Sequence, residues 1–522
     1  MNTRIIIFLH LVFVLPALVN GQTTAQVIPK PQKMELAQGV FKITPATSIL
    51  SQKELLTSAK QLKGYLEPAL GYDLAVNPKS GKKNVINLKL DKSLVQLGEE
   101  GYKLGITPDN ITLAAFSEKG IFWGIQTLRQ LLPAPIFREA QVQEISWEIP
   151  CLKIEDCPRF KWRGVMLDCS RTFITKEEIK KYLEAMSLFK MNVLHMHLTD
   201  DQGWRLEIKK YPELSSISSR FHESFKEPKE YEGFYSQDDI RELIKFAAQR
   251  NIMIVPEIEM PGHTTEVFAA FPQLSCKGDT NKIHPWTKGY GVHNEVFCAG
   301  NEQTFEFLQN VLNEVSALFP SEYIHIGGDE APKMHWKACP KCQKRMADEG
   351  LKDENELQSW FVKRIEKYLN SKGKKLIGWD EIMEGGLSKS ATVMYWRGWV
   401  KDVPQKVAAL GNNIIMTPTS HCYFDYTYEK ISTERVYSFN PVPPGFDEKF
   451  VEKVLGVQAN FWSHLDRTPP RIDRQLFPRL LALAEVAWTN NDKKDWNDFK
   501  VRLQSKLKSL EILGISYTIG NY

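Results

Sequence analysis

The sequence has no concentration of charge of one sign. Lys and Arg total 67 and Asp and Glu total 63, which gives a formal net charge of +4 over 522 residues. Proteins that bind nucleic acid or an anionic membrane surface gather positive charge on one face or segment. We therefore expect neither partner. Hydrophobic residues make up 43% and charged residues 25%, as in ordinary globular proteins, and the length suits two or more domains.

Long apolar runs are also absent after the N-terminus, so we expect no membrane insertion. The one apolar run, Ile5 to Leu18, follows Arg4 and precedes a small-residue exit at Val19 to Gly21. This is the pattern of a signal peptide, because a bilayer span needs roughly 20 residues. We expect residues 1–21 to be removed and the protein to be exported, into a periplasm or the medium. A buried N-terminal helix is the alternative.

The sequence has only one Cys-x-x-Cys pair, Cys339 and Cys342, among eight cysteines. A zinc site needs four ligands, usually as two spaced pairs, and no second pair of this spacing exists. We therefore expect a local disulfide or free thiols there, and no metal. Export permits disulfides, and Cys276 and Cys298 bracket a loop, so they are the preferred pair.

The chain divides into two regions of different pattern. Residues 22–152 alternate strand-like pieces with polar turns, which predicts a small α+β domain. From residue 153 to 522, eight strand candidates alternate with amphipathic helices, as in a (β/α)8 barrel. A doubly wound open sheet is the alternative, but no Gly-x-Gly-x-x-Gly turn follows the first strand.

Polar and aromatic residues gather where the barrel strands are expected to end, at the face that carries the active site in such barrels. Ion-pair networks at strand ends are the alternative. The residues are Asp168, Ser170, Arg171, Asp200, Asp201, Glu257, Glu259, His263, Asp329, Glu330, Trp379, Asp380, Glu381, Trp396 and Trp462.

Three of these stretches carry recognisable chemistry. Adjacent carboxylates, Asp329 and Glu330, close the run "EYIHIGGDEAP", and paired carboxylates serve glycoside hydrolysis. His195 and His197 in "HMH" point to one side of a strand and suit a metal, but packed or hydrogen-bonded histidines are the simpler interpretation. The acid pair of "GWDE", after another strand, we expect to be structural.

Several motifs in fixed order carry a resemblance to a known family. "LDCSRTF", "HMHLTDDQGWR", "PEIEMPGH", "HIGGDEAP", "GWDE", "YW" and "YFDY" are similar to those of glycoside hydrolase family 20, the β-N-acetylhexosaminidases. The resemblance covers nearly the whole mature chain. It implies an exo-acting, retaining, cofactor-free enzyme that removes terminal β-linked GlcNAc or GalNAc from glycans. Which sugar, which linkage and which oligomeric state stay open.

In this family the nucleophile is the carbonyl oxygen of the substrate's own 2-acetamido group, an exception to the two-carboxylate rule. Glu330 resembles the general acid that protonates the leaving oxygen and later activates water. Asp329 resembles the residue that holds the acetamide N–H and stabilises the positive charge that develops on the acetamide. Adjacent carboxylates are therefore useful, because one serves the leaving group and the other serves the nucleophile.

The resemblance extends to further residues. Arg171 resembles the Arg that grips sugar hydroxyls through paired donors, and Asp200 and His263 resemble a relay that orients the acid. Tyr423 resembles the hydroxyl that steadies the attacking carbonyl, and Asp425 a partner for sugar hydroxyls. Three tryptophans resemble the walls around the acetamide methyl, with core packing as the alternative: Trp379, Trp396 and Trp462.

One motif departs from the family pattern. Many members have Trp-x-Glu after the last strand, where this chain has "FWSHLDR", with His464 and Arg467 in place of an anion. One hypothesis is therefore that the enzyme accepts or prefers 6-O-sulfated GlcNAc; the alternative is that His464 bonds a neutral hydroxyl. A non-catalytic sugar-binding relative and a family 18-like chitinase are further alternatives, but the acid pair is retained and the Asp-x-x-Asp-x-Asp-x-Glu motif is missing.

Overall fold

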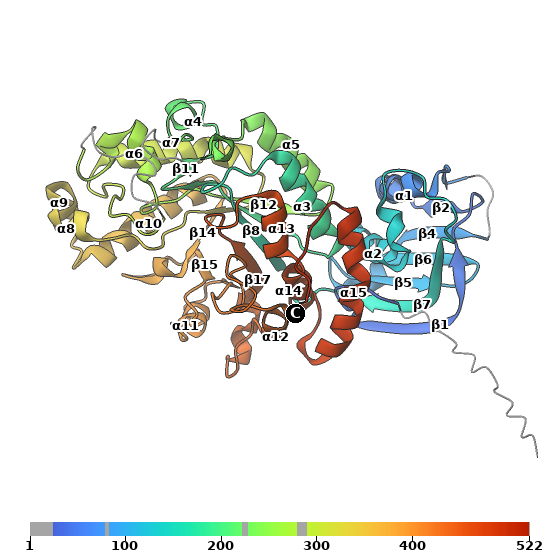
Figure 1. Ribbon diagram of the computed structural model, residues 1–522. Coiled ribbons are helices and arrows are strands. Elements are labelled where there is room, and N and C mark those ends of the chain that lie inside the picture. Colours follow the sequence, from blue (N-terminus) through green and yellow to red (C-terminus); the bar gives the residue numbers. More distant parts are fainter. Residues whose placement is uncertain (1–24, 79–82, 222–227, 279–289, 521–522) are drawn as a thin grey trace, which may run out of the picture.

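The computed structural model describes residues 25–78, 83–221, 228–278 and 290–520. Figure 1 shows a smaller N-terminal part (blue to cyan) beside a larger part that holds the rest of the chain. The predicted signal peptide lies outside the described residues, so it stays a prediction. Among the described helices, none is both long and apolar enough to cross a membrane.

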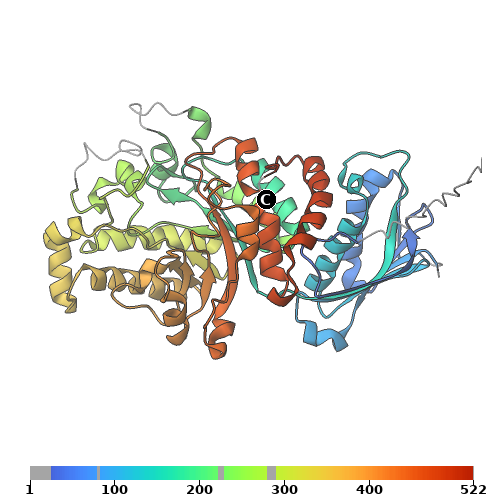
Figure 2. The ribbon, with the colours of Figure 1, turned by 60° about the horizontal axis from the view of Figure 1, so that its bottom comes forward.

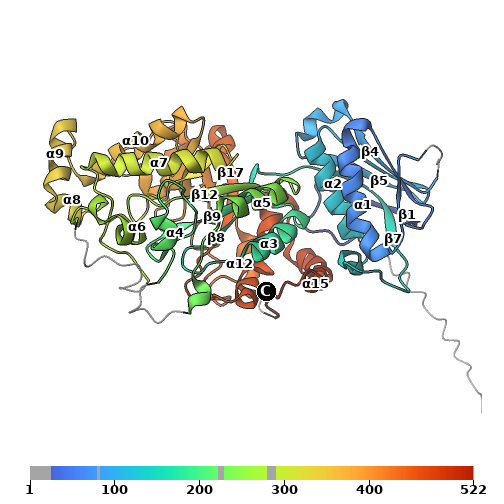
Figure 3. The same ribbon diagram turned by 90° about the horizontal axis from the view of Figure 1, so that it is seen from above.

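The N-terminal domain is a seven-stranded mixed sheet with two long helices. The strand order is β1-β7-β5-β6-β4-β2-β3. Figures 2 and 3 show α1 and α2 on the side of the sheet that faces the larger domain. The elements are β1 (Lys33–Lys42), β2 (Ser48–Ser51), α1 (Leu56–Leu70), β3 (Ala75–Val76), β4 (Val85–Leu90), β5 (Tyr102–Ile106), β6 (Asn110–Ala115), α2 (Glu118–Leu131) and β7 (Glu148–Asp156).

Buried ion pairs connect the two domains. Lys190 Nζ lies 2.9 Å from Asp156 Oδ2, and both side chains are fully buried. Arg163 Nη2 lies 2.7 Å from Glu100 Oε1. Removing one member of such a pair leaves an unpaired buried charge, which is costly. These two pairs therefore fix the sheet domain against the larger domain. Its strand β7 continues to Asp156, beyond the boundary that we placed after residue 152.

The larger domain is a closed barrel of eight parallel strands, as predicted. Each strand predicted from the sequence is present, because each is a short, almost fully buried run of mainly apolar residues. The strands are β8 (Trp162–Asp168), β9 (Val193–His197), β12 (Met253–Glu257), β13 (Tyr323–His325), β14 (Lys375–Trp379), β15 (Thr392–Tyr395), β16 (Ile414–Met416) and β17 (Val454–Phe461).

Helices cover the outside of the barrel. Thr175 and Ser236 cap two of them in capping boxes, as their sequence positions predict. A short 3-10 helix, Asp380–Met383, replaces the α-helix between β14 and β15. The helices are α3 (Lys176–Leu188), α4 (Glu213–Ser216), α5 (Gln237–Ala248), α6 (Thr265–Ala270), α7 (Glu302–Leu318), α8 (Met334–Ala338), α9 (Pro340–Glu349), α10 (Glu354–Ser371), α11 (Val403–Ala409), α12 (Thr433–Ser438), α13 (Pro469–Leu476), α14 (Arg479–Trp488) and α15 (Trp496–Ile512). Strands β10 (Thr199–Asp200) and β11 (Gly203–Trp204) form a small ribbon after β9.

The barrel interior is filled by side chains. A buried cluster includes Trp162, Val193, Val255, Tyr323 and Ile377, with Trp379 and Met394 packed beside them. This layer closes the barrel axis. A ligand can therefore enter only from the end where the strands finish, which is where the polar residues of the sequence lie.

The cysteines differ from the prediction. All eight lie in the described part of the chain and all are free, so the predicted disulfide between Cys276 and Cys298 is absent. The "CPKC" pair does have partners. Its two sulfurs, Cys339 and Cys342, meet those of Cys276 and Cys298 in one cluster. No second Cys-x-x-Cys exists, as stated from the sequence, and the thiols of Cys339 and Cys342 are free, which was one of the two expectations for them. Their neighbours in the cluster, Cys276 and Cys298, come from a pair of much wider spacing.

Candidate active site

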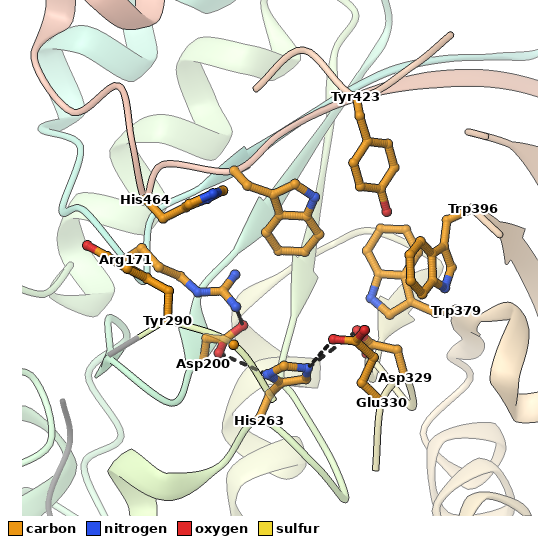
Figure 4. A pocket seen from close by; sticks show the side chains of 12 residues that line it. Arg171, Asp200, His263, Tyr290, Asp329, Glu330, Trp379, Trp396, Tyr423 and His464 are labelled. Atoms are coloured by element: carbon orange, nitrogen blue, oxygen red, sulfur yellow. Dashed lines mark ion pairs between the residues drawn. The ribbon is translucent and has the colours of Figure 1, made fainter. Parts of the chain in front are cut away.

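A pocket of about 240 Å³ opens at the carboxyl ends of the barrel strands. Ten of the twelve predicted site residues line it. Figure 4 shows those that it labels around one cavity. The lining residues are Arg171, Asp200, His263, Tyr290, Gly291, Asp329, Glu330, Trp379, Trp396, Tyr423, Trp462 and His464. Asp425 and Arg467 are not among them. Tyr290 and Gly291 were not predicted, because the loop that carries them has no motif.

Two glycines place the paired carboxylates after β13. Gly327 and Gly328 have φ angles of +69° and +91°. A Cβ on Gly327 would lie 1.6 Å from Glu259 Oε2, so only glycine fits there. Glu330 itself has a φ of +42°, a region that a residue with a side chain rarely adopts. Backbone strain of this kind gathers at functional sites.

His263 joins the acid pair to a second group of carboxylates. Its Nε2 lies 3.5 Å from Glu330 Oε2 and 3.7 Å from Asp329 Oδ2. Its Nδ1 lies 3.2 Å from both Asp200 Oδ1 and Asp201 Oδ2. Although burial opposes the charged form, Asp200, with Asp201 and Glu330, raises the pKa of His263 well above its usual range. The imidazole is therefore cationic at neutral pH.

Asp329 is buried at the bottom of this arrangement. Burial raises its pKa to about 7, and the carboxylates of Glu257 and Glu330 act in the same direction against His263. Its Oδ1 makes no hydrogen bond within the described part of the chain. A buried acceptor of this kind is costly unless a ligand donates to it. Asp329 is thus prepared to accept a hydrogen bond from a substrate N–H.

Arg171 is held by acids on one side of the pocket. Its Nη2 lies 2.6 Å from Asp200 Oδ2, its Nη1 lies 3.5 Å from Asp168 Oδ2, and its Nε donates to Gln202 Oε1 at 2.8 Å. Its guanidinium lies 5.0 Å from the ring centre of Trp462. These contacts fix the orientation of the guanidinium at the pocket wall, and N–H groups that they do not use can donate to a polar ligand there.

Aromatic side chains form the opposite wall. Trp379 and Trp462 lie 6.0 Å apart, and Trp396 stacks on Tyr423 at 6.2 Å between ring centres. Buried carboxylates orient two of the indoles. Trp379 Nε1 donates to Glu257 Oε1 at 2.9 Å, and Trp396 Nε1 donates to Glu381 Oε2 at 2.8 Å. The wall is therefore a rigid apolar surface rather than loose packing.

The hydroxyl of Tyr423 points into the pocket toward this wall and the acid pair (Figure 4). Burial holds the pKa of Tyr423 well above its usual range, so the phenol keeps its proton and acts as a donor. The "GWDE" acids were expected to be structural, and they contact Trp396 from behind. Asp380 accepts the backbone N–H of Trp396, and Glu381 accepts its indole N–H.

The two residues that depart from the family motif, His464 and Arg467, lie in different surroundings. His464 lines the pocket, with its ring 5.5 Å from that of Tyr290. Burial, assisted by Arg171, lowers the pKa of His464, which favours the neutral imidazole. Arg467 donates to Thr172 Oγ1 at 2.8 Å and to the carbonyl oxygen of Arg171 at 3.0 Å. Arg467 thus supports Arg171 from outside the pocket.

Asp425 is buried two residues after Tyr423. Burial raises its pKa to about 7, and its Oδ1 makes no hydrogen bond within the described residues. A buried carboxylate oxygen without a hydrogen bond can accept one from a ligand hydroxyl group. Its predicted role stays a prediction.

The two histidines of "HMH" lie beneath the pocket in a hydrogen-bonded network. His195 Nε2 lies 3.0 Å from Glu257 Oε2, and His197 contacts both Glu257 and Asp200. Glu257 in turn bonds Trp379 and contacts His325 at 2.7 Å. Glu257 was not assigned a role from the sequence. It connects the strand-end carboxylates to the aromatic wall, which only the folded barrel reveals.

Adjacent acids in a small pocket at the carboxyl end of a (β/α)8 barrel, with aromatic walls and a held arginine, are the parts of a sugar-cleaving enzyme, so the fold and the site define a glycoside hydrolase. Comparison with protein families agrees. The model of the glycosyl hydrolase family 20 catalytic domain matches residues 160–491, and that of the family's domain 2 matches residues 24–157. The chain belongs to glycosyl hydrolase family 20.

Individual relatives support this membership. A β-hexosaminidase of Porphyromonas gingivalis is 43% identical over 94% of this chain, which spans 64% of that protein. A mutant Streptomyces plicatus β-hexosaminidase in complex with its product GlcNAc is 30% identical, with a TM-score of 0.83 over 95% of this chain and 97% of that one. An exo-β-N-acetylglucosaminidase of Vibrio harveyi in complex with N-acetylglucosamine is 31% identical, with a TM-score of 0.84 over 95% and 79%.

Proposed function

We propose that the protein is an exo-acting, retaining β-N-acetylhexosaminidase that removes a terminal β-linked N-acetylhexosamine from glycans, with the acetamide of the substrate as the nucleophile. Family membership supports the sugar class, as do the GlcNAc complexes of the Streptomyces plicatus and Vibrio harveyi relatives. The single observation that carries the mechanism is the distribution of carboxylates in the pocket.

Three carboxylates line the described pocket, and one of them is already engaged. Asp200 pairs with Arg171, His197 and His263. The other two, Asp329 and Glu330, are neighbours in the chain. A retaining enzyme with its own nucleophile needs two carboxyl groups roughly 5 Å apart across the scissile bond, on opposite sides of the sugar. Since the pocket offers no free carboxylate opposite the acid pair, the nucleophile comes from the substrate.

In this mechanism the pocket folds the acetamide toward the anomeric carbon. Asp329 accepts the acetamide N–H, and the Tyr423 hydroxyl donates to the carbonyl oxygen. The tryptophan wall encloses the methyl group. Holding a nucleophile in a near-attack geometry can supply about 7–11 kcal/mol of the barrier. When the carbonyl oxygen attacks, positive charge develops on the acetamide nitrogen, and ionised Asp329 stabilises it.

Glu330 handles the leaving group. Its side chain is 40% exposed and lies nearer the solvent than Asp329, where the aglycone must sit. It protonates the glycosidic oxygen as the bond breaks and then takes a proton from the water that opens the cyclic intermediate. His263 orients the carboxyl group of Glu330, and Asp200 holds His263. Two displacements at the same carbon give net retention.

The pocket size limits the substrate. A cavity of about 240 Å³ is smaller than the sites of roughly 300–1,000 Å³ that take drug-sized ligands. It suits one sugar ring with its acetamide rather than a stretch of chain. Closed by the barrel core beneath, such a pocket accepts the end of a glycan, and it therefore supports exo action.

Hydrolysis of aryl β-GlcNAc beside aryl β-glucoside tests this proposal. The two substrates share the ring and the leaving group and differ at the acetamide. We expect rapid release of the aryl group from the first and a rate for the second that is lower by several orders of magnitude. Comparable rates would show that the acetamide is not the nucleophile. Release of single sugars from the non-reducing end of a chitin oligosaccharide tests exo action separately.

The 6-O-sulfate hypothesis receives less support from the site than the neutral alternative. His464 lines the pocket, but its lowered pKa favours the uncharged ring. Arg467 is directed at Thr172 and the Arg171 carbonyl rather than into the pocket. The non-catalytic alternative is also disfavoured, since the acid pair and the acetamide pocket occur together. Export to a periplasm or the medium remains part of the proposal.

A further inference from the structure

Four cysteines from distant parts of the chain meet outside the active-site pocket. Cys276 follows α6, Cys298 precedes α7, and Cys339 and Cys342 lie at the start of α9. Their sulfur atoms all lie within 4.8 Å of one another. Three of the four side chains are buried and Cys276 is half-buried. The other cysteines of the chain take no part in the cluster.

The spacing of the sulfurs matches a metal site and not a disulfide. Three Sγ–Sγ distances are 3.7 Å: Cys276 to Cys342, Cys298 to Cys339, and Cys298 to Cys342. A tetrahedral zinc ion with Zn–S bonds of about 2.3 Å separates its ligands by about 3.8 Å. A disulfide requires about 2.05 Å. These three distances match the edges of a tetrahedron of the size that zinc requires, with the sulfurs at its corners.

The backbone is built to bring the two pairs together. A Cβ on Gly300 would lie 2.2 Å from the carbonyl oxygen of Lys341 and 2.5 Å from the nitrogen of Cys342, so glycine is required there. Trp336 Nε1 donates to the carbonyl oxygen of Phe297 at 2.9 Å, next to Cys298. The turn after Cys298 is thus held against the first turn of α9, and the residue before Cys298 is held against α8, independently of the thiols.

We propose that Cys276, Cys298, Cys339 and Cys342 bind one zinc ion in a closed, structural tetrathiolate site. Each thiol releases its proton on binding, so four protons leave and four Zn–S bonds form without oxidation or reduction. All four ligands come from the protein, which leaves no position for water, and the site is therefore not catalytic.

The site connects two segments that reach the active-site pocket. The chain between Cys276 and Cys298 carries Tyr290 and Gly291, which line the pocket. The chain before Cys339 descends from Asp329 and Glu330. A zinc ion at the cluster ties the pocket wall to the segment that bears the acid pair. Loss of the metal is thus expected to weaken substrate binding as well as stability, although the site itself does no chemistry.

Metal content and thiol oxidation of the full-length chain, purified without chelator, decide the proposal. Elemental analysis by inductively coupled plasma mass spectrometry is expected to find close to one zinc per chain. Mass spectrometry of the denatured protein is expected to give the mass of the fully reduced chain. A mercurial that blocks the thiols is expected to release the zinc. Zinc-free protein overturns the proposal, whether its mass shows two disulfides or free thiols. This measurement needs no variant and does not depend on the proposed activity.

Matched variants assign the ligands. Cys276→Ser removes the half-buried ligand and is expected to lower the zinc content by most of its wild-type value. Cys157→Ser changes another half-buried cysteine, outside the cluster, and is expected to keep the zinc. Equal zinc contents in the two variants would contradict the assignment. Should Cys276→Ser fail to fold, the metal content of the wild-type chain still decides.

Discussion

The Nε2 atom of His263 lies 3.5 Å from Oε2 of Glu330. The other ring nitrogen faces Asp200 and Asp201. A cationic imidazole therefore stands between Glu330, the proposed general acid, and a pair of buried acids. The charges of His263, Asp200 and Asp201 are already in place beside Glu330. Less reorganisation is therefore needed when Glu330 gains or loses a proton.

The change Glu330→Gln removes the general acid and keeps the shape of the side chain. We expect kcat/KM to fall by about 10²–10⁴ on substrates with poor leaving groups, because these need protonation. A substrate with an acidic phenol as leaving group needs less help and should lose much less. Parallel rate measurements on both substrates, with circular dichroism to confirm the fold, check this. Equal losses on both would argue against an acid role.

The change Asp329→Asn is expected to stabilise the protein at neutral pH while impairing catalysis. Burial raises the pKa of Asp329 from 3.8 to about 7, so the folded protein binds its proton more tightly than the unfolded chain does. The contribution of Asp329 to the free energy of unfolding therefore falls as pH rises from about 4 to about 7, by a few kcal/mol at most.

Asparagine does not ionise and escapes this loss. We expect the variant to melt above the wild type at pH 8 and at the same temperature near pH 4, in thermal unfolding followed over that range. Groups that do not interact with Asp329 contribute the same pH dependence to both proteins, and that part cancels in the difference. A variant that melts below the wild type at pH 8 would refute the pKa argument.

Glu381 is expected to act as a positioning residue for Trp396. The change Glu381→Ala leaves the buried indole N–H without an acceptor, and we expect kcat/KM to fall by roughly 5–100-fold. Glu381→Gln keeps a carbonyl acceptor and should recover most of the activity. Glu384→Ala is the matched control, because both acids pair with Arg397, Glu381 at 3.8 Å and Glu384 at 2.8 Å, whereas the indole N–H of Trp396 donates to Glu381. A loss in Glu381→Gln as large as in Glu381→Ala would mean that the charge, not the hydrogen bond, matters.

Gly327 and Gly350 separate steric overlap from backbone strain. Both have left-handed backbones, with φ angles of +69° and +65°. A Cβ on Gly327 meets Glu259 Oε2 at 1.6 Å, whereas a Cβ on Gly350 meets nothing within 4 Å. We expect Gly350→Ala to cost about 1 kcal/mol and Gly327→Ala at least about 3 kcal/mol in denaturant unfolding. Equal costs would show that the acid-pair turn is not tightly packed.

The barrel could be predicted from the sequence because its strands are local. "RGVMLDCS" and "VLGVQANFW" are each buried along their length and each ends in polar residues, so both the strand and its active end are visible in the sequence. The connection after β14 could not be predicted. Residues Asp380 to Met383 form a 3-10 helix, and Asp380 accepts hydrogen bonds from the backbone N–H groups of Trp396 and Arg397. These two residues directly follow β15, so the contact forms only in the folded barrel.

Some residues of the site could likewise be predicted from the sequence, and others could not. Residues in motifs at strand ends, such as Asp329 and Arg171, could be located without a structure. Tyr290 could not, because its contacts depend on how a long loop folds. Glu257 was placed at a strand end from the sequence, but its contacts with Trp379 and His325 depend on the folded barrel interior. The cysteine cluster is a third case. Cys298 and Cys339 are 41 residues apart, and no periodicity indicates that their sulfurs meet.

The most direct test of the mechanism is the rate of hydrolysis of aryl glycosides whose N-acetyl group carries zero, one, two or three fluorine atoms. Fluorine withdraws electrons from the carbonyl oxygen and weakens it as a nucleophile, while the ring and leaving group stay the same. An attacking acetamide predicts that kcat/KM falls steeply with each fluorine. A rate that does not change along the series would contradict it and would require a nucleophile from the protein.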